Sequence, residues 1–190
     1  MPHNPALARL TLKPICGAEP SAMKTRNSLS DNPSNPVRNV RHARNRILVV
    51  DDDSSVREML TRVLVGEGYL VWSAANGAAA LELAGANKID LVMLDLNLPG
   101  NSGWQIFQKF MVENPLLTVI IITARSNQLF TALGAGVAAL LEKPFNFPVL
   151  LQTVGRLLAE PIEMHRARAA GRPVDFQYLH AQPGEPEKNH

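Results

Sequence analysis

Short apolar runs alternate with segments of helical periodicity between residues 46 and 160. Each run is rich in β-branched residues and ends at polar residues, which is typical of buried parallel strands. The runs predict five strands, at Ile47–Val50, Tyr69–Ala74, Leu91–Leu94, Leu117–Ile122 and Ala138–Leu141. A helix is expected after each strand. We expect Ser55 and Glu58 to form a capping box for the first helix, and Asn76 to cap the second.

Five strands alternating with five helices over short connections predict one parallel sheet with helices on both faces. Right-handed crossovers between the strands favour a doubly wound topology. We therefore expect the α/β class, with a five-stranded parallel sheet at the centre of a three-layer α/β/α sandwich.

Charge and composition divide the chain into three parts. Residues 1–45 form a proline-rich basic arm; with Arg46 included, eight Lys or Arg face two acids, a net charge of +6. The body, residues 46–160, is acidic: from residue 47 on, seven basic residues face eleven acids. We predict a disordered arm and a flexible tail over residues 161–190, because neither contains enough apolar side chains to offset the entropy of ordering.

Composition excludes several classes of protein. With 46% hydrophobic and 19% charged residues, the chain can build a core, which excludes full disorder. No run approaches the roughly 18 apolar residues of a membrane span, so we expect no membrane insertion. The single cysteine, Cys16, cannot form an internal disulfide, and the N-terminus lacks the hydrophobic region of a secretory signal. We therefore expect a cytoplasmic protein.

Polar residues with related chemistry follow four of the five predicted strands. They are Asp51, Asp52 and Asp53 after the first strand, Asp95 after the third, Thr123 after the fourth and Lys143 after the fifth. In a doubly wound sheet these strand ends meet at one edge. Carboxylates about 4 Å apart repel by roughly 4 kcal/mol at an effective dielectric near 20, so such a cluster needs a cation. Oxygen ligands without histidine or cysteine favour Mg²⁺, which would suit the handling of a phosphoryl group.

Four segments of the chain resemble the receiver domain of two-component response regulators. They are ILVVDDD at 47–53, LVMLDLNLPG at 91–100, VIIITA at 119–124 and EKPF at 142–145. The resemblance spans about residues 46–160, in the order and spacing of the family. It implies a flavodoxin-like sheet with strand order 2-1-3-4-5.

The resemblance also implies a phosphorylation site with its metal. Asp95 matches the phosphoacceptor, which takes its phosphoryl group from a sensor histidine kinase or a histidine phosphotransfer protein. Asp52 matches the direct Mg²⁺ ligand, and Asp51 the neighbour that positions a metal-bound water. Asn97 stands where the family contributes a backbone carbonyl to the metal.

Two further residues match the family's switch residues, and a third position differs from the family. Thr123 matches the switch hydroxyl, and Lys143 the phosphate-pairing lysine, whose bond to Pro144 is cis in this family. The family often places Tyr or Phe three residues before the lysine, where this chain has Leu140. The chemistry at Asp95 should survive this change, but the usual coupling between aromatic ring and threonine cannot operate.

The main functional hypothesis is a signalling switch that catalyses only its own phosphorylation and dephosphorylation. It would bind a downstream effector protein through the fourth helix, the fifth strand and the last helix. A transcription regulator using the basic arm is an alternative, but neither tail has a helix-turn-helix pattern, which argues against a nucleic-acid partner. A phosphohydrolase would need a general acid where Asn97 stands. A receiver-like scaffold that is never phosphorylated is the remaining alternative.

Overall fold

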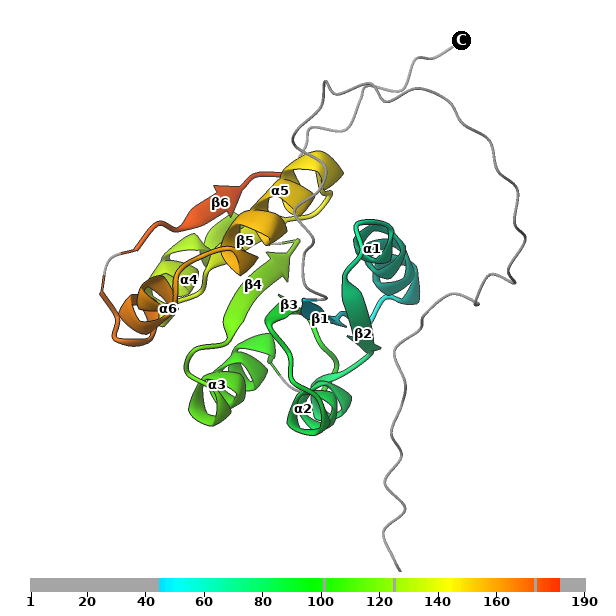
Figure 1. The fold of residues 1–190 in the computed structure, drawn as a ribbon. Coiled ribbons are helices and arrows are strands. Elements are labelled where there is room, and N and C mark those ends of the chain that lie inside the picture. Colours follow the sequence, from blue (N-terminus) through cyan, green and yellow to red (C-terminus); the bar gives the residue numbers. More distant parts are fainter. Residues whose placement is uncertain (1–44, 101, 125, 173, 182–190) are drawn as a thin grey trace, which may run out of the picture.

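The computed structural model describes residues 45–100, 102–124, 126–172 and 174–181 (Figure 1). The strands are β1 (Arg46–Val50), β2 (Leu70–Ala74), β3 (Leu91–Asp95), β4 (Thr118–Thr123), β5 (Ala139–Glu142) and β6 (Gln177–Leu179). The helices are α1 (Ser54–Gly66), α2 (Gly77–Ala86), α3 (Gly103–Glu113), α4 (Leu129–Ala135), α5 (Phe147–Leu158) and α6 (Ile162–Ala169), with the 3₁₀ turn η1 (Ser126–Gln128) before α4. The predicted arm lies outside the described residues except for its last residue.

The six strands form one parallel sheet in the order β2-β1-β3-β4-β5-β6. Alternate strand residues face opposite sides of the sheet. On one side they pack against α2, α3 and α4, through residues such as Ile106 and Ala132. On the other side they pack against α1 and α5, through residues such as Leu60 and Val154. The predicted three-layer sandwich is confirmed (Figure 1).

The first five strands lie within one residue of their predicted bounds at each end. Asn76 caps α2 as expected, since its side chain accepts a hydrogen bond from the backbone N–H of Ala79 (2.9 Å). The predicted capping box at α1 is wrong. Asp53 caps this helix instead, and its carboxylate accepts hydrogen bonds from the backbone N–H groups of Ser55 (2.8 Å) and Val56 (3.4 Å). These backbone hydrogen bonds lower the pKa of Asp53 below its usual range.

The sheet has one strand more than the five predicted, because the described part of the expected flexible tail contains α6 and β6. Pro161 precedes α6 with an extended backbone, and the chain then returns to add β6 beside β5. Residues 182–190 of the predicted tail lie outside the described residues. This segment has no local periodicity that predicts a strand, because β6 is only three residues long and is held by pairing with β5, which lies far from it in sequence.

One local and two long-range polar contacts hold α6 against the body. The guanidinium of Arg168 donates a hydrogen bond to the carboxylate of Glu160 at 2.8 Å, and both side chains are at least nine-tenths buried. The imidazole Nδ1 of His165 lies 3.3 Å from the Thr118 hydroxyl and 3.1 Å from the backbone carbonyl of Leu116. These contacts place α6 beside the first residue of β4.

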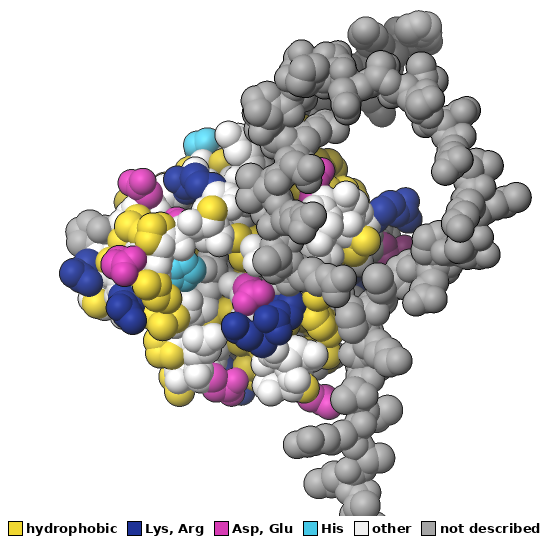
Figure 2. All heavy atoms as spheres, in the orientation of Figure 1, with side chains coloured by type: hydrophobic (Ala, Val, Ile, Leu, Met, Phe, Trp, Pro, Cys, Tyr) yellow, Lys and Arg dark blue, Asp and Glu magenta, His cyan; other side chains and the backbone are white. Residues whose placement is uncertain are grey.

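The surface of the described residues is mixed in character. Acidic, basic and hydrophobic side chains are interspersed on the face shown in Figure 2. None of the helices in the described ranges has the length and apolar character needed to cross a bilayer.

The buried ion pair yields a test of the ordered C-terminal segment. Arg168→Met leaves the buried Glu160 carboxylate without its cation, so we expect it to lower the free energy of unfolding by about 3 kcal/mol in urea denaturation. Glu160→Leu combined with Arg168→Met should recover most of this loss, because no charge is then left buried. A change below about 0.5 kcal/mol for the single substitution, typical of exposed sites, would contradict an ordered segment.

Candidate active site

Two acidic residues with different environments, Asp51 and Asp52, directly follow β1. Asp51 is fully buried, and its backbone N–H donates to the carbonyl of Ala74 on β2 (3.2 Å). Its carboxylate Oδ1 accepts the backbone N–H of Asp53 at 3.0 Å. Asp52 is exposed. The Asp51 carboxylate is therefore held by the backbone through one oxygen, while the other faces the site.

Arg57 on α1 braces this turn, which the sequence analysis did not foresee. Its Nη1 donates to the backbone carbonyls of Asp51 (2.7 Å) and Asp52 (2.9 Å). Backbone carbonyls are present at every residue, so a side chain that contacts them is not part of a sequence motif. Arg57 therefore could not be identified from the sequence. Its contacts fix the direction in which the two carboxylates leave the end of β1.

β3 supplies the third carboxylate. The side chain of Asp95 is 3% exposed, and its Oδ1 accepts the backbone N–H of Asn97 at 2.9 Å. The start of α3 lies close behind it: a Cβ added at Gly103 would stand 2.5 Å from the Leu96 Cα and 2.6 Å from the Asp95 carbonyl oxygen. Only glycine therefore lets α3 begin against the end of β3.

Lys143, directly after β5, joins the two buried carboxylates. Its Nζ donates to Asp51 Oδ2 at 2.7 Å and to Asp95 Oδ2 at 2.5 Å. Burial alone would lower the pKa of Lys143, but the hydrogen bonds to both carboxylates outweigh it and raise the pKa above its usual value. The ammonium group therefore stays charged and holds the ends of β1, β3 and β5 together.

The charged form of Asp51 is less favoured in this arrangement than the charged form of Lys143. Burial raises the pKa of the Asp51 carboxyl and outweighs the hydrogen bond from Lys143, and the nearby charge of Asp95 acts in the same direction. A raised pKa means that folding favours the protonated acid, so ionised Asp51 destabilises the fold at neutral pH.

Thr123 and the cis bond between Lys143 and Pro144 are the remaining features predicted for the site. Thr123 is the last residue of β4 and is fully buried. Its backbone carbonyl accepts the N–H of Lys143 at 2.9 Å. The Lys143–Pro144 bond is cis, as the resemblance implied. The role of the Thr123 hydroxyl stays a prediction.

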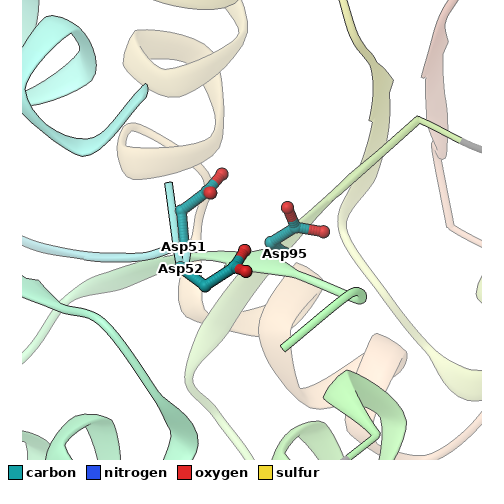
Figure 3. A group of neighbouring side chains, drawn as sticks. All are labelled: Asp51, Asp52 and Asp95. Carbon is teal, nitrogen blue, oxygen red and sulfur yellow. The ribbon is translucent and has the colours of Figure 1, made fainter. Parts of the chain in front are cut away.

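The three carboxylates can together hold a metal ion. Asp51, Asp52 and Asp95 each offer an oxygen, and these oxygens lie within 4.8 Å of one another (Figure 3). Lys143 neutralises only one of the three negative charges, so a further cation is favoured. Three carboxylate oxygens suit a hard ion such as Mg²⁺, so the donor set fits the predicted metal. The backbone carbonyl of Asn97 stays a predicted ligand.

The comparison with protein families identifies this chain. Residues 47–155 match the response regulator receiver domain. The chain belongs to this family. Receiver domains are signalling switches that bind Mg²⁺ at an acidic pocket, and this chain has a cluster of Asp51, Asp52 and Asp95 that could hold a metal ion. The resemblance noted in the sequence and the flavodoxin-like fold are both confirmed.

Solved structures share the fold of this receiver. The response regulator TrrA from Thermotoga maritima, solved in complex with Mg²⁺ and BeF, is 34% identical with a TM-score of 0.56, over 60% of this chain and 98% of that one. A CheY-like receiver domain protein from Methanospirillum hungatei is 29% identical with a TM-score of 0.58, over 60% of this chain and 93% of that one.

Curated relatives share only the receiver part. The response regulator MprA of Mycobacterium sp. (strain KMS) is 38% identical over 115 residues, which cover 60% of this chain and half of MprA. The DNA-binding transcriptional regulator NtrC of Escherichia coli K12 is 33% identical over 124 residues, which cover 64% of this chain and 26% of NtrC. The chain thus spans half or less of the length of these relatives. Because the name of NtrC describes DNA binding, the argument against a nucleic-acid partner is not supported.

The burial of Asp51 predicts a stabilising substitution. Because its pKa is raised, the stability associated with Asp51 is full below about pH 3.8 and is lost as pH rises through the folded-state pKa. We expect Asp51→Asn to unfold at a higher urea concentration than the wild type at pH 7 without divalent metal, and the gap to narrow towards pH 3. The matched change at its exposed neighbour, Asp52→Asn, should have little effect. A less stable Asp51→Asn at pH 7 would contradict the analysis.

Proposed function

We propose that this receiver accepts a phosphoryl group on Asp95 and signals through the resulting change in its surface. The donor is the phosphohistidine of a sensor histidine kinase or a histidine phosphotransfer protein. The observation that carries the proposal is the placement of one ammonium, that of Lys143, on two buried carboxylates from different strands. A structural ion pair needs one carboxylate; a second one beside it lowers stability and calls for a functional reason.

The transfer forms one bond and breaks one. An oxygen of Asp95 attacks phosphorus, the P–O bond forms as the P–N bond to the donor imidazole breaks, and the imidazole nitrogen keeps the electron pair of that bond. Lys143 then pairs with an oxygen of the phosphoryl group, and the Thr123 hydroxyl donates a hydrogen bond to another. Catalysis of this kind rests on position and charge, and the backbone contacts of Asp95 and Asp51 supply the position.

A Mg²⁺ ion fits beside these residues. Asp52, Asp95 and the backbone carbonyl of Asn97 are its proposed direct ligands, and Asp51 is proposed to position a water bound to the ion. The ion neutralises negative charge that gathers when a phosphoryl group approaches the carboxylates. Arg57 contributes by holding the carbonyls of Asp51 and Asp52, so that both side chains face the same space.

The proposed output is protein–protein interaction. The phosphoryl group on Asp95 carries about −1.5 to −2 charges in place of the single charge of the carboxylate. This added charge lies where β4 and β5 end and shifts the balance between two surface conformations. Residues 46–160 are the proposed switch unit, and α4, β5 and α5 form the proposed surface for an effector protein. Phe130 on α4 is 84% exposed, which gives that surface an apolar contact point.

The experiment is a measurement of intact-protein mass after incubation with phosphoramidate and Mg²⁺. We expect the wild type to gain one phosphoryl group, and Asp95→Asn or a reaction in chelator to gain none. Asp53→Asn is the matched control: it removes a neighbouring acid but keeps a good helix cap, so it should be phosphorylated like the wild type.

Two results would overturn the proposal. Folded wild type that gains no phosphoryl group from phosphoramidate or from a phosphorylated kinase would favour the receiver-like scaffold. Equal gain in the wild type and in Asp95→Asn would place the acceptor elsewhere.

A further inference from the structure

The C-terminal segment adds a strand to the sheet beyond the residues that match the family. The match ends at residue 155, whereas β6 pairs with β5 in parallel, with Ala139 opposite Gln177, Leu140 opposite Tyr178 and Leu141 opposite Leu179 (Figure 1). β6 therefore covers an edge of β5 that would otherwise present unpaired backbone groups.

The hold of β6 on the sheet is modest. Phe176 and Tyr178 pack on the side of α4, against the core that contains Leu140, and Leu179 packs on the side of α5. All three residues of the strand are only half-buried. A strand with three residues and one paired edge lies at the low end of local stability, where segments open without global unfolding.

One side chain of β5 depends on this segment for its hydrogen bonds. Glu142 is 9% exposed as a residue, and its two carboxylate oxygens accept hydrogen bonds from the Tyr178 hydroxyl and the backbone N–H of Ala181 (3.3 Å). None of the ion pairs among the described residues includes Glu142. The hydrogen bond raises the pKa of Tyr178 to about 12, so the hydroxyl remains a donor at neutral pH.

The same end of β5 carries the phosphorylation lysine. Glu142 directly precedes Lys143, and it lies opposite Thr123 in the register of β4 and β5. Lys143 in turn donates its backbone N–H to Thr123 and its ammonium to Asp95. Two adjacent residues at the end of β5 therefore have different partners: Lys143, just after the strand, contacts the acidic site, and Glu142, its last residue, contacts the segment that contains β6.

We propose that β6 is a latch on β5 that phosphorylation of Asp95 opens, by weakening the hydrogen bond between Tyr178 and Glu142; the inference rests on the proposed function. A phosphoryl group adds negative charge near the end of β5 and draws the ammonium of Lys143 towards itself. Both changes make a buried carboxylate at Glu142 less favourable and promote its hydration. A cavity of about 230 Å³ borders Glu142, Tyr178 and His180, which gives water a route to the carboxylate.

The latch links the phosphorylation site to the surface of the sheet, a role that Leu140 cannot fill because it lacks the aromatic ring that the family often places there. The ring of Tyr178 lies across from Leu140, on the neighbouring strand, so the aromatic residue of this region comes from outside the matched segment. Opening frees the edge of β5 over Ala139–Leu141 for a partner strand. Coupling is reciprocal: if phosphorylation weakens the latch by some factor, an open latch strengthens phosphoryl binding by the same factor.

Amide hydrogen exchange of the full chain tests the latch, with Mg²⁺ and beryllofluoride as the probe in place of the phosphoryl group. We expect exchange of the peptide that contains β6 to become about tenfold faster when the probe is bound, as for the loss of one hydrogen bond to a charged group. A ¹⁹F resonance of bound beryllofluoride reports occupancy separately. Bound probe with unchanged or slower exchange in β6 would overturn the latch alone. Absence of bound probe in folded protein would overturn the proposed function and the latch with it.

Tyr178→Phe tests the same hydrogen bond without phosphorylation, since it keeps the ring and removes the hydroxyl. We expect about tenfold faster exchange in β6 without any probe, and tighter binding of beryllofluoride by a similar factor. Tyr69→Phe is the matched control, because Tyr69 lies beside β2 at the opposite edge of the sheet and should change neither quantity. Faster exchange without tighter binding would overturn the coupling.

Discussion

The rest of the site depends on the ammonium of Lys143, which lies between the carboxylates of Asp51 and Asp95. Each carboxylate is buried, and two such groups side by side repel strongly when no cation is present. One lysine satisfies both only because it reaches them from the end of a third strand. The arrangement joins β1, β3 and β5 while leaving the cluster short of positive charge. That shortage favours a further cation, which is the basis of the proposed Mg²⁺ site.

The fold supplies this geometry at low cost because parallel strands end at one edge of the sheet. Backbone hydrogen bonds from Asp53 and Asn97 orient the carboxylates, and Gly103 lets α3 begin directly behind Asp95. None of these contacts requires a side chain to move. Under the proposed function, a charge added at Asp95 acts first on Lys143, its ion-pair partner, and the proposed latch extends this effect to β6, which pairs with β5.

Most of this architecture could be predicted from local patterns. Continuous apolar runs located the first five strands within one residue, and the polar residues after them identified the site before any distance was known. The prediction of the α1 cap was wrong because Asp53 and Ser55, two residues apart, both offer a side-chain oxygen that can cap a helix. The sequence alone does not show which of the two does so. β6 and the contacts of Arg57 could not be predicted for another reason. β6 depends on pairing with a strand far away in the sequence, and Arg57 contacts backbone carbonyls, so neither leaves a periodic pattern.

The central claim is that Asp95, one of the two carboxylates held by Lys143, is the residue that receives the phosphoryl group. Reduction of the phosphorylated protein with borohydride, followed by peptide mass mapping, tests it most directly, because an acyl phosphate on aspartate is converted to homoserine. The account predicts homoserine at position 95 and aspartate at positions 51, 52 and 53. Homoserine at any of those three positions, with position 95 unchanged, would contradict it.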